Sequence, residues 1–165
     1  MLQVKNIPPK IGYYLAGFAD GEGSFNVSFR PREDYKIPWK ISLCFNISQR
    51  DRVILSLYKK YLKCGRIRSR KDGVFYYEVN NLTAILENVI PFFNRFAFLS
   101  AKKKRDFSKF KQIAGIMKEG RHLELEGINK IMAIHRDMND GGKHRYSEEK
   151  IRKLLENPQR PYAGS

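Results

Sequence analysis

The sequence predicts an α+β fold with the element order αββαββα, in which one antiparallel sheet carries helices on a single face and further helices follow. Four short segments alternate polar and apolar residues, which is typical of strands with one buried face. Segments with helical periodicity lie before, between and after them. Of the 165 residues, 42% are hydrophobic, enough to bury a core. We expect one domain, with its core over about residues 12–117, C-terminal helices over about 121–155 and a tail over 156–165.

The first half of the predicted fold is a helix followed by a hairpin. The helix is expected over residues 10–20, because Pro8-Pro9 favours a helix start and the glycines within 21–23 favour its end. Residues 24–32 then alternate polar and apolar side chains, and the alternation resumes over residues 40–48. These two segments are expected to pair as an antiparallel hairpin.

The second half repeats this order. Apolar residues at helical spacing predict a helix over residues 51–63, which Cys64-Gly65 ends. Two more strands are expected over residues 66–70 and 74–80, joined by a turn at Lys71-Asp72-Gly73.

Four helices are expected after the sheet. An amphipathic pattern covers residues 82–93, a basic helix covers 102–117, and a further periodic segment covers 123–134. A shorter helix is expected over 147–155.

The charge balance points to a polyanionic partner. The chain has 32 Lys and Arg against 17 Asp and Glu, a formal net charge of +15. Charge of this size favours a nucleic acid, although a basic protein without such a partner would share it. No apolar run approaches the roughly 20 residues of a membrane span, and residues 1–10 do not resemble a signal peptide. We expect an intracellular protein with two reduced cysteines, Cys44 and Cys64.

The face of the sheet without helices is the expected nucleic-acid surface, since its polar and basic side chains suit base edges and phosphates. The candidate contacts are Ser24, Asn26, Ser28, Arg30, Arg32, Lys40, Ser42, Asn46, Ser48, Arg66, Arg68, Arg70, Tyr76, Glu78 and Asn80. An ordinary solvated face would also be polar. Arg66, Arg68 and Arg70 argue against that alternative, because like charges at this spacing repel unless something anionic covers them.

The most distinctive stretch, residues 15–23, reads Leu-Ala-Gly-Phe-Ala-Asp-Gly-Glu-Gly and occurs once. It places two acids, Asp20 and Glu22, at a helix C-terminus, where the helix dipole disfavours negative charge. A hard cation, which prefers oxygen ligands, would offset that cost. A solvated helix end is the alternative for an isolated pair of acids.

Metal-assisted phosphodiester hydrolysis also needs an oriented water and a cation that stabilises developing charge. Gln49, at the end of the second strand, is a candidate for the first task. Arg52 or the run Lys102-Lys103-Lys104 is a candidate for the second.

As a set, these features resemble the LAGLIDADG family of homing endonucleases over about residues 12–117. The resemblance implies a Mg²⁺-dependent DNA endonuclease in which Mn²⁺ substitutes and Ca²⁺ binds without turnover. The implied catalytic residues are Glu22, Gln49, Arg52, Lys102 and Lys103, and the implied metal ligands are Glu22, the Gly21 carbonyl and Asp20.

Because the motif occurs once, cleavage of both strands of double-stranded DNA implies a homodimer and a near-palindromic target. The expected interface residues are Tyr13, Ala16, Gly17 and Asp20, of which the small ones let two helices approach closely. Tyr13, like Phe18, could also pack into the core.

Two other functions remain open for such a fold. One is an RNA-binding splicing cofactor (a maturase) acting on intron RNA, and the other is a DNA-binding regulator without catalysis. The presence of Glu22, Gln49 and the lysine run favours the nuclease over both. We expect synthesis inside a chloroplast or mitochondrion, or in a prokaryotic cytoplasm.

Overall fold

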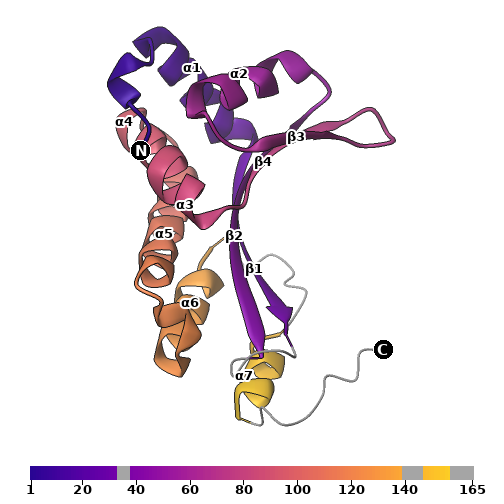
Figure 1. The fold of residues 1–165 in the computed structure, drawn as a ribbon, viewed down its shortest axis with the longest axis vertical. Helices are drawn as coiled ribbons and strands as arrows, with labels where there is room; N and C mark the ends of the chain where they lie inside the picture. Colours follow the sequence, from indigo (N-terminus) through magenta and orange to yellow (C-terminus); the bar gives the residue numbers. More distant parts are fainter. Residues whose placement is uncertain (33–37, 139–146, 157–165) are drawn as a thin grey trace.

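The structure, a computed structural model, describes residues 1–32, 38–138 and 147–156 (Figure 1). Its main elements are α1 (Pro9–Glu22), β1 (Gly23–Pro31), β2 (Trp39–Gln49), α2 (Arg52–Leu62), β3 (Arg66–Ser69), β4 (Phe75–Val79), α3 (Leu82–Ala84), α4 (Ile90–Arg95), α5 (Ala101–Lys118), α6 (Leu125–Arg136) and α7 (Glu148–Glu156). This order confirms the predicted αββαββα core and the added C-terminal helices. The link at residues 33–37 and the tail at 157–165 lie outside the described residues.

The strands form one antiparallel sheet in the order β1-β2-β4-β3. The predicted hairpin is confirmed, with Gly23 opposite Ile47 and Pro31 opposite Trp39. Side chains alternate between the core and the open face, as the period of two predicts. In Figure 1, α3, α5 and α6 lie along one side of β1 and β2. These helices do not cover the other side of the two strands, which is the open face of the sheet.

An aromatic cluster fills the space between the sheet and the helices. The Phe25 ring of β1 lies 5.1 Å from that of Phe45 on β2 and 4.9 Å from that of Phe110 on α5, measured between ring centroids. Phe93 and Phe98 stack at 4.6 Å beside it. Burying each ring stabilises the fold by roughly 1.5–3 kcal/mol, so this cluster fixes α5 against the strands.

Helix α1 runs two residues further than the sequence predicts, and includes Gly21 and Glu22. It ends at Gly23, whose backbone is extended (φ −78°, ψ 150°) and whose N–H donates to the Ala19 carbonyl. A Cβ on residue 23 would lie 2.8 Å from that carbonyl oxygen, so the tight passage from helix to strand requires glycine there. Gly21 does not stop the helix, because its backbone meets no such constraint.

The helix predicted over residues 82–93 is interrupted by a π-helical segment, Ile85–Val89. Pro91 has no N–H to donate to the Glu87 carbonyl four residues earlier, and this gap in the hydrogen-bond ladder accounts for the widened turn. The Glu87 carbonyl instead accepts a hydrogen bond from the backbone N–H of Leu2 at 2.7 Å.

Among the described residues, no helix is both long and apolar enough to cross a membrane.

Candidate functional site

The end of α1 presents Glu22 at the start of the sheet. Its side chain is exposed, whereas Gly23 and Ala19 are buried beneath it. The last carbonyls of a helix, here including that of Gly21, have no intrahelical partner. The last turn of α1 therefore offers one exposed carboxylate beside backbone oxygens.

Asp20, the other acid of the motif, is bound within the chain. Its Oδ2 accepts hydrogen bonds from the backbone N–H groups of Leu99 and Ser100, both at 3.0 Å, and its Oδ1 accepts one from the Ser100 hydroxyl. Burial raises the pKa of Asp20, but the hydrogen bonds from Ser100 and Leu99 outweigh it and hold the pKa below its usual value. Asp20 thus anchors the start of α5, and the engagement of both its carboxylate oxygens argues against the predicted metal-ligand and interface roles.

Of the two candidate lysines, Lys103 reaches the end of α1. Its Nζ donates a hydrogen bond to the Gly23 carbonyl, and its backbone N–H donates to the Ser100 hydroxyl at 3.3 Å, capping α5. Burial lowers the pKa of Lys103, and the negative charges of nearby acids, Asp20 and Glu22 among them, oppose that effect only in part. Lys102 lies exposed on the first turn of α5. The geometry therefore favours Lys103 as the lysine of the site.

Gln49 and Arg52 lie at the same end of the sheet. Gln49 ends β2 two residues beyond Ile47, the partner of Gly23, and is partly buried. Arg52 begins α2, with its guanidinium 6.0 Å from the ring centroid of Phe75, the register partner of Gln49. The fold thus gathers Glu22, Lys103, Gln49 and Arg52 at one end of the sheet.

The oxygen donors at this end suit a hard divalent cation, but a single chain supplies few of them. Within the described residues, no three His, Cys, Asp or Glu side chains cluster as a metal site. Mg²⁺ commonly takes one or two carboxylates and completes its shell with water and substrate phosphates. Glu22 and the Gly21 carbonyl fit that mode of binding.

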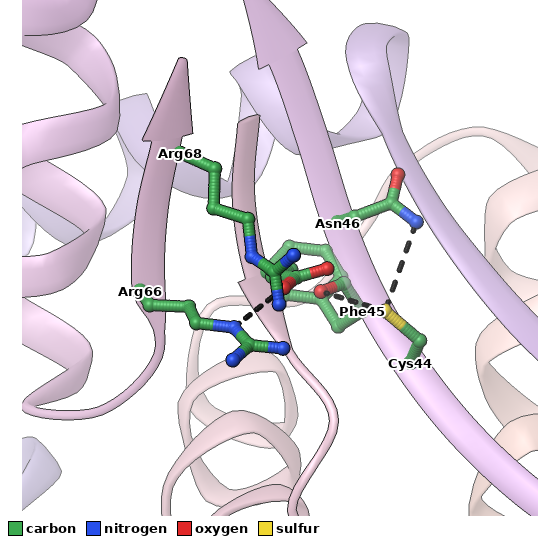
Figure 2. Close-up of polar contacts among 6 residues, drawn as sticks. Cys44, Phe45, Asn46, Arg66 and Arg68 are labelled. Carbon is green, nitrogen blue, oxygen red and sulfur yellow. Dashed lines mark hydrogen bonds and ion pairs between the residues drawn. The ribbon is translucent and has the colours of Figure 1, made fainter. Parts of the chain in front are cut away.

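The open face of the sheet carries the predicted nucleic-acid contacts. Ser28, Arg30, Lys40, Ser48, Arg66, Arg68, Arg70 and Asn80 are exposed, and Ser24, Asn26, Arg32, Ser42, Asn46, Tyr76 and Glu78 are partly buried. Cys44, which was not among the candidates, lies on the same face. Its sulfur accepts a hydrogen bond from Asn46 Nδ2 at 3.8 Å (Figure 2), and burial raises the pKa of its thiol.

One interpretation of this face needs correction. Arg66, Arg68 and Arg70 do not require an external anion, because the chain supplies acids for them. Glu78 on β4 pairs with both Arg66 and Arg68, whose side chains extend from β3 across the sheet in Figure 2. Asp72 in the turn lies 2.9 Å from Arg70. The arginines alone therefore do not distinguish a binding face from a solvated one.

Besides Asp20, the outer face of α1 differs from the expected interface at Ala16. Ala16 is 2% exposed and packs into the core of its own chain, so its side chain cannot contact a partner. Tyr13 and Tyr14 are each 56% exposed, and Gly17 and Gly21 lie on the same exposed side of the helix. Tyr14 was missed in the sequence, since exposed and buried tyrosines look alike in a short helix.

Ser100 was also missed, although a signal for it exists. A serine directly before a helical segment is a common N-cap, and Ser100 precedes the basic helix α5. Its contact with Asp20, 80 positions away, could not be read from that signal.

The chain is similar to known proteins over most of its length. Residues 15–114 match the model of the LAGLIDADG endonuclease family. "Probable intron-encoded endonuclease 2" of Neurospora crassa is 32% identical over 132 residues, which cover 78% of this chain and 29% of the fungal protein. "Homing endonuclease I-ApeII" of Aeropyrum pernix is 29% identical over 115 residues, covering 68% of each protein.

Solved structures show the same fold. I-TnaI, a homing endonuclease, superposes with a TM-score of 0.76 at 32% identity, covering 91% of this chain and 97% of its own. I-SmaMI bound to cleaved DNA gives a TM-score of 0.75 at 34% identity, covering 80% of this chain and 45% of its own. The chain thus spans less than half of the Neurospora protein and of I-SmaMI. With a family match over most of its αββαββα core, this chain belongs to the LAGLIDADG endonuclease family.

Proposed function

We propose that two copies of this chain form a site-specific homing endonuclease, which makes a metal-dependent double-strand break in a long, near-palindromic DNA target. Each copy contributes one endonuclease domain. The observation that carries the proposal is the exposed Glu22 carboxylate at the end of α1, beside Lys103, which is held against Gly23. This pair lies at one end of a sheet whose open face is polar and basic.

Each residue of the site has a distinct proposed task. Glu22 and the Gly21 carbonyl hold the divalent ion, for which we propose Mg²⁺, with Mn²⁺ as a substitute and Ca²⁺ as an inert occupant. When bound, the ion supplies Lewis-acid polarisation of the scissile phosphate and a water of lowered pKa. Gln49 orients the attacking water, and Lys103 stabilises negative charge on the leaving oxygen. Arg52, an exposed residue at the start of α2, holds a phosphate of the DNA.

The dimer is proposed from the exposed side of α1. Tyr13 and Tyr14 present aromatic surface, while a Cβ at Gly17 or Gly21 would meet no atom of the described residues within 4 Å. Helices pack closely where side chains are absent, so two such faces related by a two-fold axis bring two Glu22 carboxylates near each other. I-SmaMI is bound to DNA in its crystal structure, and the part of it that matches this chain is 45% of its length.

Relatives named as intron-encoded support an intron origin for this chain, and we propose its synthesis inside an organelle or a prokaryote.

The decisive experiment is cleavage-site selection from a randomised duplex DNA library with Mg²⁺, run in parallel with Ca²⁺. We expect defined cleaved sequences with Mg²⁺ and bound but intact DNA with Ca²⁺. Glu22→Gln should abolish cleavage and leave binding largely intact, because the amide keeps the shape of the side chain but not its charge. Full cleavage by Glu22→Gln would refute the metal assignment, and binding to structured RNA in place of DNA would favour a splicing cofactor.

A further inference from the structure

Glu78 is the one acidic residue among the outward-facing positions of the four described strands. It lies on β4, opposite Arg66 on β3 and Asn46 on β2 in the sheet register. The same face carries the basic residues Arg30, Lys40, Arg66 and Arg68. A carboxylate in this position weakens the attraction of the face for a polyanion. Glu78 instead forms ion pairs with Arg66 and Arg68.

A single oxygen of Glu78 holds two arginines. Oε1 lies 2.6 Å from Arg66 Nε and 2.8 Å from Arg68 Nε. Figure 2 shows both guanidinium groups reaching from β3 toward the same place over the neighbouring strand. A guanidinium has five N–H donors, and each of these contacts uses the Nε side. Within the part of the chain that the structure describes, their terminal amino groups remain for the bidentate pattern that guanine O6 and N7, or a phosphate, accepts.

Exposure indicates that this cluster adds little to folding stability. The side chains of Arg66 and Arg68 are 53% and 55% exposed, against 22% for Glu78. Exposed ion pairs contribute little to stability, because solvent screens them and two long side chains must be ordered. Arginine side chains that are already ordered in the free protein lose less entropy when they bind, so the ion pairs lower the entropic cost of binding.

We propose that Glu78 is a specificity-determining residue of the DNA-binding face. It holds Arg66 and Arg68 in the orientation that reads neighbouring bases, and it reduces sequence-independent attraction to the phosphate backbone. This inference rests on the proposed function, because it requires the sheet face to bind DNA.

The test uses the full chain with Ca²⁺, so that binding is measured without cleavage. The probes are the duplex that the wild type selects from a randomised library and an unrelated duplex of equal length. Glu78→Gln should bind the unrelated duplex more tightly and lower the ratio of specific to non-specific affinity by about tenfold or more. The lost preference should fall at the base pairs where Arg66→Ala and Arg68→Ala also lose it.

Glu124→Gln is the matched control. Glu124 is exposed at the start of α6, away from the strands, and makes no capping hydrogen bond through its side chain. This variant removes the same charge and should leave the ratio unchanged. Thermal melting of each variant separates a folding defect from a recognition defect. If Glu78→Gln does not fold, Arg66→Lys and Arg68→Lys make the same test, because they keep the charge and lose the guanidinium fork.

Three results would overturn the inference. An unchanged ratio in Glu78→Gln would mean that the carboxylate neither orders the two arginines for base recognition nor lowers non-specific affinity selectively. Loss of preference at a single C·G pair, with the arginine positions unaffected, would mean that Glu78 reads a base itself. Loss of both affinities with earlier melting would indicate a structural role. If the wild type selects no sequence at all, the proposed function fails instead, whatever Glu78 does.

Discussion

The side-chain amine of Lys103 donates a hydrogen bond to the backbone carbonyl of Gly23, and so joins the start of α5 to the junction of α1 and β1. A second connection runs beside it, from Asp20 to Ser100 and from the Ser100 hydroxyl to the Lys103 backbone. The lysine is therefore held at two points, by its own side chain and by the cap of its helix. The position of Lys103 relative to Glu22 depends on both.

The adjacent lysines Lys102 and Lys103 should differ sharply in their effect on cleavage. Lys103→Ala should lower the cleavage rate about 10²–10³-fold, the usual loss when one group that stabilises developing charge is removed. Lys102→Ala should change it little, since Lys102 lies exposed on the helix surface. Single-turnover cleavage of the selected target measures both rates. Equal losses in the two variants would contradict the placement of Lys103.

Loss of the Asp20 anchor should slow cleavage without abolishing DNA binding. Asp20→Asn and Ser100→Ala each remove part of the cap at the start of α5, at a cost of about 0.5–2 kcal/mol in unfolding free energy. The pKa of Asp20 is lower in the folded than in the unfolded chain, so its ionised carboxylate stabilises the fold at pH values above the unfolded-state pKa. This contribution is lost as the pH falls through the folded-state pKa.

The free energy of unfolding, measured as a function of pH on the acid side of neutrality, tests this role of Asp20. Wild type and Asp20→Asn should differ at neutral pH and converge below about pH 4, where the unfolded carboxyl is protonated. A constant difference down to pH 2, measured by urea unfolding, would show that the ionised carboxylate is not what holds α5.

Gly17→Arg should separate dimerisation from folding. The position is open within the chain, so the monomer tolerates the side chain, while a partner helix packed against this face would not. We expect a folded monomer in sedimentation that has lost double-strand cleavage. Gly115→Arg is the matched control, because Gly115 is equally open on helix α5 and gains the same helix propensity. A dimeric, active Gly17→Arg protein would refute the α1 interface.

His122 should make the fold sensitive to mild acid. Burial lowers the pKa of His122 below its usual 6.5, and its Nδ1 is a buried nitrogen without a partner among the described residues. The unfolded chain therefore takes up a proton that the folded chain resists, and stability falls as the pH drops below about 6.5. His122→Gln should flatten this dependence between pH 7.5 and 5.5 in urea unfolding. An unchanged slope would assign it to other groups.

The sequence predicts the sheet and its faces well, because the alternation in β1 and β2 is a direct consequence of strand geometry. Other features depend on distant contacts. The role of Asp20 depends on Ser100, and the neutralisation of Arg66 and Arg68 depends on the register between β3 and β4. Ala16 looks like an interface residue because it is small, but a small side chain suits a tight core equally well. The roles of Glu22, Gln49 and Arg52 remain predictions.

The bond between Leu2 and the Glu87 carbonyl has a practical consequence for engineering. Leu2 and Ile7 are buried, and the backbone N–H of Leu2 supplies the Glu87 carbonyl with the donor that Pro91 lacks. Trimming the first seven residues would leave a carbonyl without its donor and expose apolar surface beneath α4. A purification tag or a linker that fuses two copies in tandem must therefore extend from this segment, not replace it.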